Sequence, residues 1–270
     1  MVREPVRILS DLHLGHSVSR LRDVERLRPL IRGAGTVIFN GDTWQELSTA
    51  FRPQAEILLD GLRRMCEEEG VEAIFLSGNH DPGWPGKGWI SLAAGKIIIT
   101  HGDALLYGGS PWKREILRNA KRVEELWADF PTAETDAETR IHLARRIAQE
   151  LRSVRHPQGR HLHQRAWDAM VPPSRAWKML AAWLTQADAG AAFCERYFPQ
   201  AECLIIGHFH YGGLWLKRGI RVINTGSFMN PGRAGWIEWR GEWLRYGLVE
   251  ESPEGCGFGP CLREWQFPVS

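Results

Sequence analysis

The sequence lacks the features that mark membrane-spanning and disulfide-stabilised proteins. No segment approaches the roughly 18 consecutive apolar residues of a transmembrane helix. The five cysteines are widely scattered without a C-x-x-C pair, so neither a disulfide framework nor a zinc ribbon is indicated. The chain begins without the apolar region of a signal peptide. We therefore expect reduced thiols and a cytoplasmic protein, with peripheral contact to the inner membrane as a further possibility.

The sequence also lacks a large excess of charge of either sign. The 34 Lys and Arg residues nearly balance the 32 Asp and Glu residues, which does not by itself argue for a nucleic-acid or membrane partner. Hydrophobic residues make up 43% and the mean hydropathy is −0.31, which excludes a disordered, collagenous or polytopic membrane chain. At 270 residues the chain is long enough for one large domain or a core with an insertion.

Strand-like and helix-like patterns alternate over the first hundred residues. Short β-branched runs predict strands at 6–10, 36–40, 72–77 and 96–100, and helical patterns lie between the first three, around 19–32 and 53–69. This order predicts a mostly parallel sheet with helices on its faces, and ligands bind outside the carboxyl ends of such strands.

Helical patterns alone continue from about residue 104 to residue 200. Strand patterns then return at 203–206, 214–216, 221–224, 235–239 and 243–249. We predict an α/β core made of residues 1–103 and 201–250, interrupted by an all-helical insertion, residues 104–200, that forms a lid. Residues 251–270, which are rich in glycine, are expected to form an irregular C-terminal extension.

Polar residues of the types that bind metal ions follow the predicted strands. The five blocks are Asp11-Leu12-His13, Gly41-Asp42, Gly78-Asn79-His80-Asp81, His101-Gly102-Asp103 and Gly207-His208-Phe209-His210. The carboxyl ends of neighbouring parallel strands converge, so these side chains should meet at one edge of the sheet. Alternation along an extended strand would place Asp11 and His13 on one side, and His208 and His210 likewise. Oxygen and imidazole ligands without cysteine suit divalent Mn, Fe, Zn, Co or Ni.

Each block alone also has an ordinary structural explanation. Asp residues cap helices or satisfy loop amides, and Asn and Gly suit left-handed turns. The occurrence of all five blocks in this order, each after a predicted strand, favours a metal site.

With these blocks the sequence resembles the calcineurin-like metallophosphoesterases over about residues 6–103 and 202–250, and Asn224-Thr225-Gly226-Ser227 resembles a turn of that superfamily. The resemblance implies a four-layer αββα sandwich and two divalent metal ions, with Mn²⁺ expected. It implies that Asp42 bridges the two ions and that His80, which is not a ligand, faces the leaving group. The implied ligands of the first ion are Asp11, His13 and His210, and those of the second are Asn79, His101 and His208.

Such a site explains why these residue types are present. Two cations about 3.5–4 Å apart share one carboxylate, generate a hydroxide near neutral pH and hold the phosphoryl oxygens during in-line attack. A histidine beside them can protonate the departing oxygen, because its unperturbed pKa lies near the working pH. Asp81 and Asp103 are expected to orient ligand imidazoles or to form turns. His16 is expected to be a solvated loop residue.

Basic residues concentrate in the predicted insertion. Residues 140–178 contain nine Arg and Lys residues against two acidic residues. This pattern predicts either a solvated helix face or a lid that binds an anionic substrate, with Arg152, Arg155 and Arg160 as the binding residues. The tryptophans of the segment are expected in the lid core, and an amphipathic lid could also hold an acyl chain.

The layout also resembles the UDP-2,3-diacylglucosamine diphosphatases, through Ser10-Asp11-Leu12-His13-Leu14 and His101-Gly102-Asp103. That family usually has Arg where this chain has His80. We expect a two-metal hydrolase that cleaves a phosphodiester, phosphomonoester or pyrophosphate bond in an anionic substrate with a nucleotide or lipid part. The alternatives are a nuclease of the same superfamily, which would need an extended basic groove, and a non-catalytic scaffold, which would be expected to have lost ligands.

Overall fold

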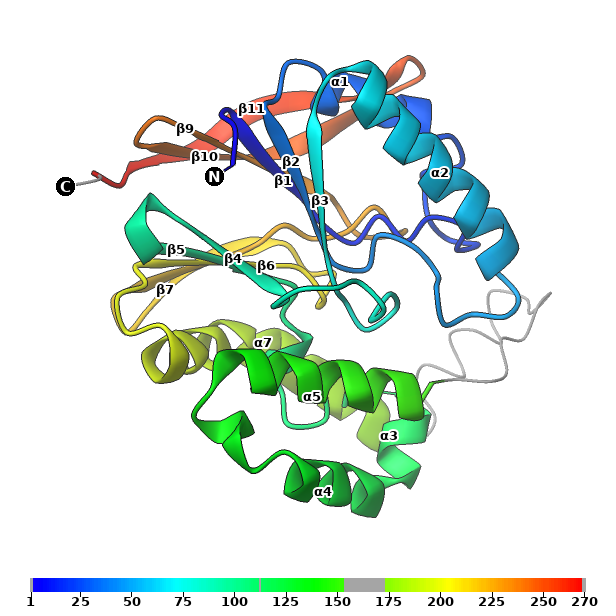
Figure 1. Cartoon of the computed structure of the whole chain (residues 1–270), viewed down its shortest axis with the longest axis vertical. Helices are drawn as coiled ribbons and strands as arrows, with labels where there is room; N and C mark the ends of the chain where they lie inside the picture. The colour runs from blue at the N-terminus through cyan, green and yellow to red at the C-terminus, as the bar shows by residue number, and fades with distance from the viewer. Residues whose placement is uncertain (1, 112, 153–172, 269–270) are drawn as a thin grey trace.

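Two β-sheets pack face to face, and helices cover both outer faces (Figure 1). The computed structural model describes residues 2–111, 113–152 and 173–268. Seven isoleucines from both sheets form much of the core between the sheets: Ile8, Ile38, Ile97, Ile99, Ile205, Ile223 and Ile237. The four-layer αββα architecture predicted from the sequence is therefore confirmed.

The first sheet has six strands in the order β11-β10-β9-β1-β2-β3. Its parallel part contains β1 (Val6–Leu9), β2 (Thr36–Asn40) and β3 (Glu72–Leu76), and its antiparallel part contains β9 (Gly235–Arg240), β10 (Trp243–Ser252) and β11 (Gly255–Gln266). The helix α2 (Arg52–Glu68) covers its outer face, with a short 3₁₀ turn (Val24–Leu27) and α1 (Arg28–Ile31) in place of the longer helix expected around 19–32.

The second sheet has five strands in the order β4-β5-β6-β8-β7. They are β4 (Trp89–Leu92), β5 (Ile97–Thr100), β6 (Cys203–Ile206), β7 (Gly213–Lys217) and β8 (Ile220–Asn224), and β5, β6 and β8 run parallel. Every residue of β6 is buried, as expected for a strand covered on both faces. The sequence patterns had not predicted β4.

Helices form the layer beyond the second sheet, shown in green and yellow-green in Figure 1. They are α3 (Arg114–Arg118), α4 (Ala120–Asp129), α5 (Ala137–Glu150) and α7 (Pro173–Tyr197), with short 3₁₀ turns at Asp103–Leu105 and Pro131–Glu134. Apolar side chains of α4 and α5, including Leu126 and Ile147, form a separate cluster. Ala191 of α7 packs instead against Leu204 and Val222 of the second sheet. No helix in the described part of the chain is long and apolar enough to cross a membrane.

The expectation of an irregular extension after residue 251 is wrong. β11 pairs with β10 from Trp243 opposite Gln266 to Ser252 opposite Gly255, with register shifts around Gly247. A Cβ at Gly247 would lie 2.6 Å from the carbonyl oxygen of Pro260. Glycine at this bulge therefore permits close approach of the two backbones within a strand pair.

Candidate metal centre

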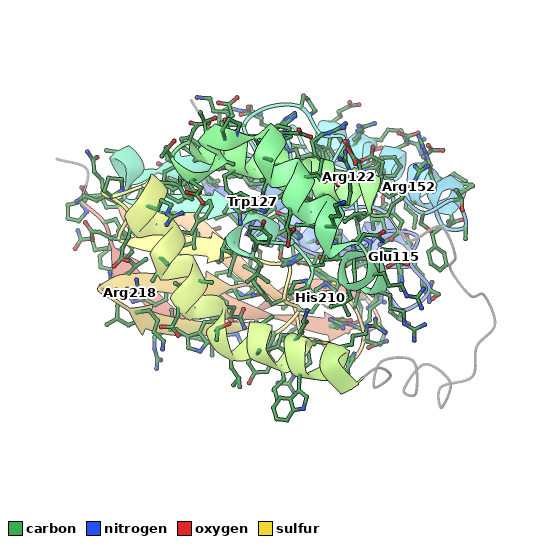
Figure 2. The ribbon with its side chains drawn as sticks, turned by 90° about the horizontal axis from the view of Figure 1, so that it is seen from below. Glu115, Arg122, Trp127, Arg152, His210 and Arg218 are labelled. Atoms are coloured by element: carbon green, nitrogen blue, oxygen red, sulfur yellow. The ribbon has the colours of Figure 1, made fainter. Side chains whose placement is uncertain are left out.

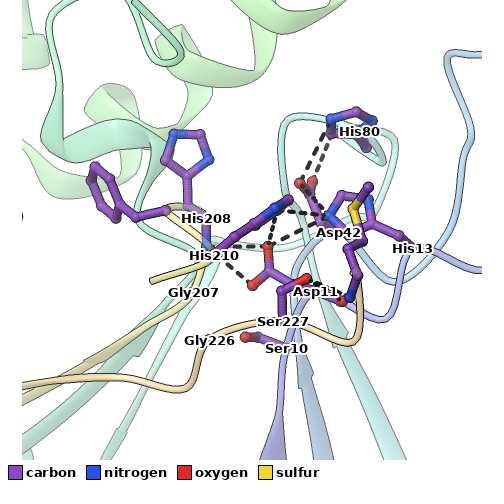
Figure 3. A network of polar contacts seen from close by, with 12 residues as sticks. Ser10, Asp11, His13, Asp42, His80, Gly207, His208, His210, Gly226 and Ser227 are labelled. Atoms are coloured by element: carbon purple, nitrogen blue, oxygen red, sulfur yellow. Dashed lines mark hydrogen bonds and ion pairs between the residues drawn. The ribbon is translucent and has the colours of Figure 1, made fainter. Parts of the chain in front are cut away.

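The candidate site lies where strand ends from both sheets meet. Asp11, Asp42 and His208 are each the second residue after their strands, β1, β2 and β6. The structure brings the seven predicted ligand residues to this edge, where Figure 3 shows several of them converging. All but His210 have buried side chains: Asp11, His13, Asp42, Asn79, His101 and His208.

The backbone at this edge differs from the extended geometry that the sequence predicted. Asp11, His13, Asp42, His208 and His210 all have φ between 48° and 65°. Residues other than glycine seldom adopt this left-handed conformation, which costs about 1–3 kcal/mol at each position. Left-handed turns, rather than strand pleating, therefore direct these side chains toward one another. Strain repeated at five residues of ligand type is typical of a functional site.

One group consists of Asp11, His13, Asp42 and His210, whose potential ligand atoms all lie within 4.8 Å of one another. Oδ1 of Asp11 is 3.1 Å from Nε2 of His210 and 3.6 Å from Nε2 of His13. The two imidazole nitrogens are 3.0 Å apart. Two nitrogens and a carboxylate oxygen thus point at one small volume.

A second group consists of Asp42, His101 and His208, again with all potential ligand atoms within 4.8 Å. Oδ2 of Asp42 lies 3.4 Å from Nε2 of His101, and 3.6 Å from Nε2 of His13 in the first group. Asn79 lines the same cavity as Asp42, His208 and His210. Asp42 therefore stands between the two groups.

The donor atoms of this edge fit metal ions. Oδ1 of Asn79 and Nε2 of His101 are buried without a hydrogen-bond partner among the described residues, a costly situation unless something binds them. Nδ1 of His101 donates to the carbonyl oxygen of Asn40, and Nε2 of His208 donates to that of Gly109. These bonds leave Nε2 of His101 and Nδ1 of His208 as the nitrogens that could accept a cation.

Electrostatics keep most of these groups in their metal-binding forms. Burial alone would raise the pKa of Asp11 and Asp42, but nearby histidines hold both carboxyl pKa values well below their usual range. Burial lowers the pKa of His208 to about 3 and lowers the pKa of His13 as well. Burial lowers the pKa of His101, but the combined attraction of Asp42, Asp11 and Asp103 outweighs it and raises this pKa well above its usual value. A cation bound to His101 would therefore compete with a proton.

Glycines allow the two carboxylates to lie against the backbone. A Cβ at Gly207 would collide with Oδ2 of Asp11, and one at Gly78 would collide with Oδ1 of Asp42. Because no Cβ is present, the two carboxylates come close enough to accept hydrogen bonds from the backbone. The backbone N–H of His208 donates to Oδ2 of Asp11 at 3.0 Å, and that of His80 donates to Oδ1 of Asp42 at 2.7 Å.

Asp81 stabilises the turns that carry the site. Its carboxylate accepts hydrogen bonds from the backbone N–H groups of Asp42, Thr43 and Gly78 and from the indole of Trp84. Burial and the neighbouring Asp42 raise its pKa to about 8. Of the two roles expected for this residue, the structure favours the turn-forming one.

His80 lies beside both groups and belongs to neither. Its Nε2 is 4.0 Å from Oδ2 of Asp42, and its side chain is 28% exposed. Gln45 connects it to a predicted ligand: the carboxamide lies 2.8 Å from Nδ1 of His13 and 3.0 Å from Nδ1 of His80. Gln45 is buried and was missed in the sequence, where its position three residues after Asp42 was the available signal.

The predicted substrate-binding arginines lie away from this edge or outside the described residues. Arg152 is exposed and follows the end of α5, to the side of His210 in Figure 2. Arg155 and Arg160 lie outside the described residues. Two other arginines of the basic window have packing roles, since Arg140 donates to the carbonyl oxygen of Leu106 and Arg145 donates to that of Gly86.

His16 and Lys113 also lie near the site. The half-buried His16 has its ring 6.3 Å from that of His13, and its Nδ1 accepts from the backbone of Val18. Lys113 lines the cavity with Asp42 and His80. Sequence reasoning overlooked Lys113 because it stands outside the basic window, just before α3.

Comparison with known proteins identifies the family to which the chain belongs. The model of a family described as calcineurin-like phosphoesterase matches residues 4–212. Similar solved structures include a conserved phosphoesterase-like protein from Streptococcus pneumoniae, with 17% identity over 98% of this chain and 99% of that chain and a TM-score of 0.41. A dimetal phosphatase from Danio rerio shares 12% identity over 98% of this chain and 100% of that chain, with a TM-score of 0.46. Vps29 complexed with Zn²⁺ from Entamoeba histolytica shares 13% identity over 97% and 99%, with a TM-score of 0.43. No curated protein matches the chain.

Proposed function

Because the chain belongs to the calcineurin-like phosphoesterase family, we propose that it hydrolyses phosphoric esters with the help of two divalent metal ions. The position of Asp42 is the observation that carries this proposal. One carboxylate oxygen faces imidazole nitrogens of both groups, 3.6 Å from His13 and 3.4 Å from His101. A carboxylate shared by two metal ions needs such a position.

The two groups divide the proposed ligands. Asp42 would contact both ions, and the donor set of oxygen and imidazole nitrogen without thiolate suits Mn²⁺, which we propose, as well as Fe, Zn, Co or Ni. When bound, such a pair activates water and neutralises the charge that develops on the phosphoryl group. Asp11, His13 and His210 would hold one ion, and Asn79, His101 and His208 the other.

His80 is proposed to donate a proton or hydrogen bond to the leaving oxygen. Its Nδ1 is held by Gln45, so Nε2 is the nitrogen that faces the cavity. Exchange of the amide oxygen and nitrogen of Gln45 would make Nδ1 of His13 a donor and Nδ1 of His80 an acceptor. That arrangement leaves Nε2 of His13 available to a metal and places the proton of His80 on Nε2, where a leaving group needs it.

The helices are proposed to recognise the remainder of the substrate. We propose that residues 104–200 form a lid on the core of residues 1–103 and 201–250, and that Arg152, Arg155 and Arg160 bind an anionic part. A nucleotide or lipid group, as in UDP-diacylglucosamine, would then lie against this lid in a cytoplasmic enzyme that contacts the membrane peripherally. The ester bond itself would be cleaved at the strand-end edge.

Hydrolysis of a substrate panel tests the proposed function. The protein loaded with Mn²⁺ should cleave at least one of a phosphomonoester, a phosphodiester and a nucleoside diphosphate sugar, and EDTA should abolish the activity. Single-stranded DNA in the same panel tests the nuclease alternative. Binding of metal without hydrolysis of any compound would indicate the scaffold, and activity that persists in EDTA would overturn the two-metal proposal.

A further inference from the structure

Lys113 carries the only ammonium or guanidinium group among the described residues that line the cavity beside the candidate metal centre. The cavity measures about 110 Å³ and also contacts Asp42, Asn79 and His80. In the described part of the chain, no carboxylate comes within ion-pair distance of the Lys113 ammonium. Asp42 and Asp103 attract it from longer range, and burial lowers its pKa.

Lys113 is half-buried, and a partly desolvated ammonium in this position is costly without an anionic partner. Removing a charged amine from water is unfavourable unless an opposite charge or hydrogen-bond acceptors replace the water. The remaining wall of the cavity includes apolar side chains of Met179, Trp183 and Phe209, which supply no such charge. The missing partner of Lys113 is therefore expected to be part of a bound ligand.

Local structure holds Lys113 against the candidate metal centre. Its backbone N–H donates to the carbonyl oxygen of Ser110, and its own carbonyl oxygen accepts from Leu117 in α3. In the same loop, the carbonyl oxygen of Gly109 accepts from Nε2 of His208 at 3.2 Å. The loop that carries Lys113 is thus bonded to a proposed metal ligand, so the backbone of Lys113 and that ligand keep a defined relation.

The cavity is small and opens to solvent, so its enclosed part suits a compact group of a ligand. Sites for drug-sized molecules usually measure about 300–1,000 Å³, well above the volume found here. A single phosphoryl group fits such a space better than a phosphate that carries two bulky ester groups. A terminal phosphoryl group has two negative charges near neutral pH, whereas a diester has one.

We propose that Lys113 binds the second negative charge of a terminal phosphoryl group, so that the site favours phosphomonoesters and terminal phosphates over phosphodiesters. This inference rests on the proposed function and narrows its substrate class to terminal phosphoryl groups, which excludes an internal diphosphate such as that of UDP-diacylglucosamine. Metal ions and His80 would act on any phosphoric ester, whereas Lys113 would distinguish the doubly charged group. Lys113 is therefore proposed as a specificity-determining residue.

A comparison of two nitrophenyl esters tests this role. Lys113→Met should lower kcat/KM for 4-nitrophenyl phosphate by about 10- to 100-fold, the range expected for a lost hydrogen bond to a charged group. The loss for bis(4-nitrophenyl) phosphate should stay below about 3-fold. Lys113→Arg should recover most of the monoester activity. Lys121→Met, which removes an exposed lysine of α4, provides the matched control and should change neither rate.

Binding of inorganic phosphate gives a readout that does not depend on turnover. Calorimetry on the Mn²⁺-loaded protein should show weaker phosphate binding in Lys113→Met and an unchanged metal content. Equal losses on both esters, no loss on either, or loss of metal would each overturn the proposal. If the wild type hydrolyses nothing, the proposed function fails, and the phosphate titration alone then decides whether Lys113 binds the anion.

Discussion

Charged side chains are buried both at the strand-end edge and among the helices, and the two regions compensate them differently. Among the helices, Arg140 donates to the carbonyl oxygen of Leu106 and its guanidinium lies 4.3 Å from the ring centre of Trp127. At the strand ends, Asp11 and Asp42 converge with several imidazoles on shared points in space. Buried charge therefore serves packing among the helices, whereas at the strand ends the buried charges converge where we propose the metal site.

The backbone shows the same difference. Five residues of ligand type at the strand ends have left-handed backbone, whereas among the described residues of 104–200 no residue other than glycine has a positive φ. α5 begins at a capped N-terminus, where Asp136 accepts from the N–H of Thr139. The helices therefore carry little backbone strain, whereas the strand-end edge carries strain at several residues. That strain lies where we propose the chemistry.

Asp42→Asn should show the largest difference in activity between a change at the strand-end edge and a change among the helices. Loss of the shared negative charge should lower kcat by at least about 10³-fold, at the upper end of the loss from a single oxyanion donor, because both metal sites are affected. Steady-state kinetics with saturating Mn²⁺ measure this effect. Asp129→Asn, at an exposed position of α4, is the control and should retain wild-type activity. A mild effect of Asp42→Asn would remove the distinction between the regions.

His80→Ala tests whether a residue at the strand-end edge acts in hydrolysis without binding metal. The variant should lose roughly 10²–10⁴-fold in kcat if His80 supplies a proton. The loss should shrink for nitrophenolate leaving groups, which need little protonation. Metal content, measured by mass spectrometry, should stay near the wild-type value because His80 belongs to neither ligand group. Loss of a metal ion, or the same loss for every leaving group, would contradict this role.

The metal-free protein should become less stable in acid because of His208 at the strand-end edge. Burial lowers the pKa of His208 to about 3. The unfolded chain therefore takes up a proton below about pH 6.5 that the fold excludes, and stability is lost as the pH falls from 6.5 toward 3. His101, whose pKa is raised, acts in the opposite direction. The unfolding free energy, measured by chemical denaturation, should fall less between pH 7 and pH 5 in His208→Gln than in the wild type. The difference should be up to about 2 kcal/mol.

The matched control for this pH dependence is His142→Gln, at an exposed position of α5. It should leave the pH dependence of the unfolding free energy as in the wild type. An identical pH dependence in His208→Gln and the wild type would show that His208 is not held neutral in the fold.

Arg152→Ala should have the smallest effect of these changes. If the helices grip a remote anionic part of the substrate, the variant should raise KM for the natural substrate and barely change activity on a small diester. Comparison of KM for the two substrates measures this. Equal losses on both, with metals intact, would place Arg152 in the reaction centre. No change on either would leave Arg152 as part of a solvated helix face.

The sequence patterns predicted the architecture and the meeting of the seven residues because both follow from strand order. Apolar runs such as Ile97–Thr100 identify buried strands, and the polar residues after parallel strands must share an edge. The left-handed backbone could not be predicted, because Asp and His adopt it more often than most residues but still only seldom. The strand β11 was missed because its glycines suggested a loop, although they permit a close strand pair.

Gln45 and Lys113 show a further limit of the sequence. Neither belongs to a recognisable block, and each acquires its role from tertiary contacts. The carboxamide of Gln45 contacts Nδ1 of both His13 and His80, and Lys113 reaches the cavity from the loop before α3. A lysine or glutamine in a loop is ordinary in sequence, so only the packing of distant segments distinguishes these two.

The metal content of the purified protein tests the central claim most directly. After loading with Mn²⁺ and removal of unbound ions by gel filtration, elemental mass spectrometry should find two ions per wild-type chain. Asp42→Asn should retain fewer than one, whereas His80→Ala should retain two. A wild-type protein that is active and insensitive to EDTA with one ion or none would contradict the account.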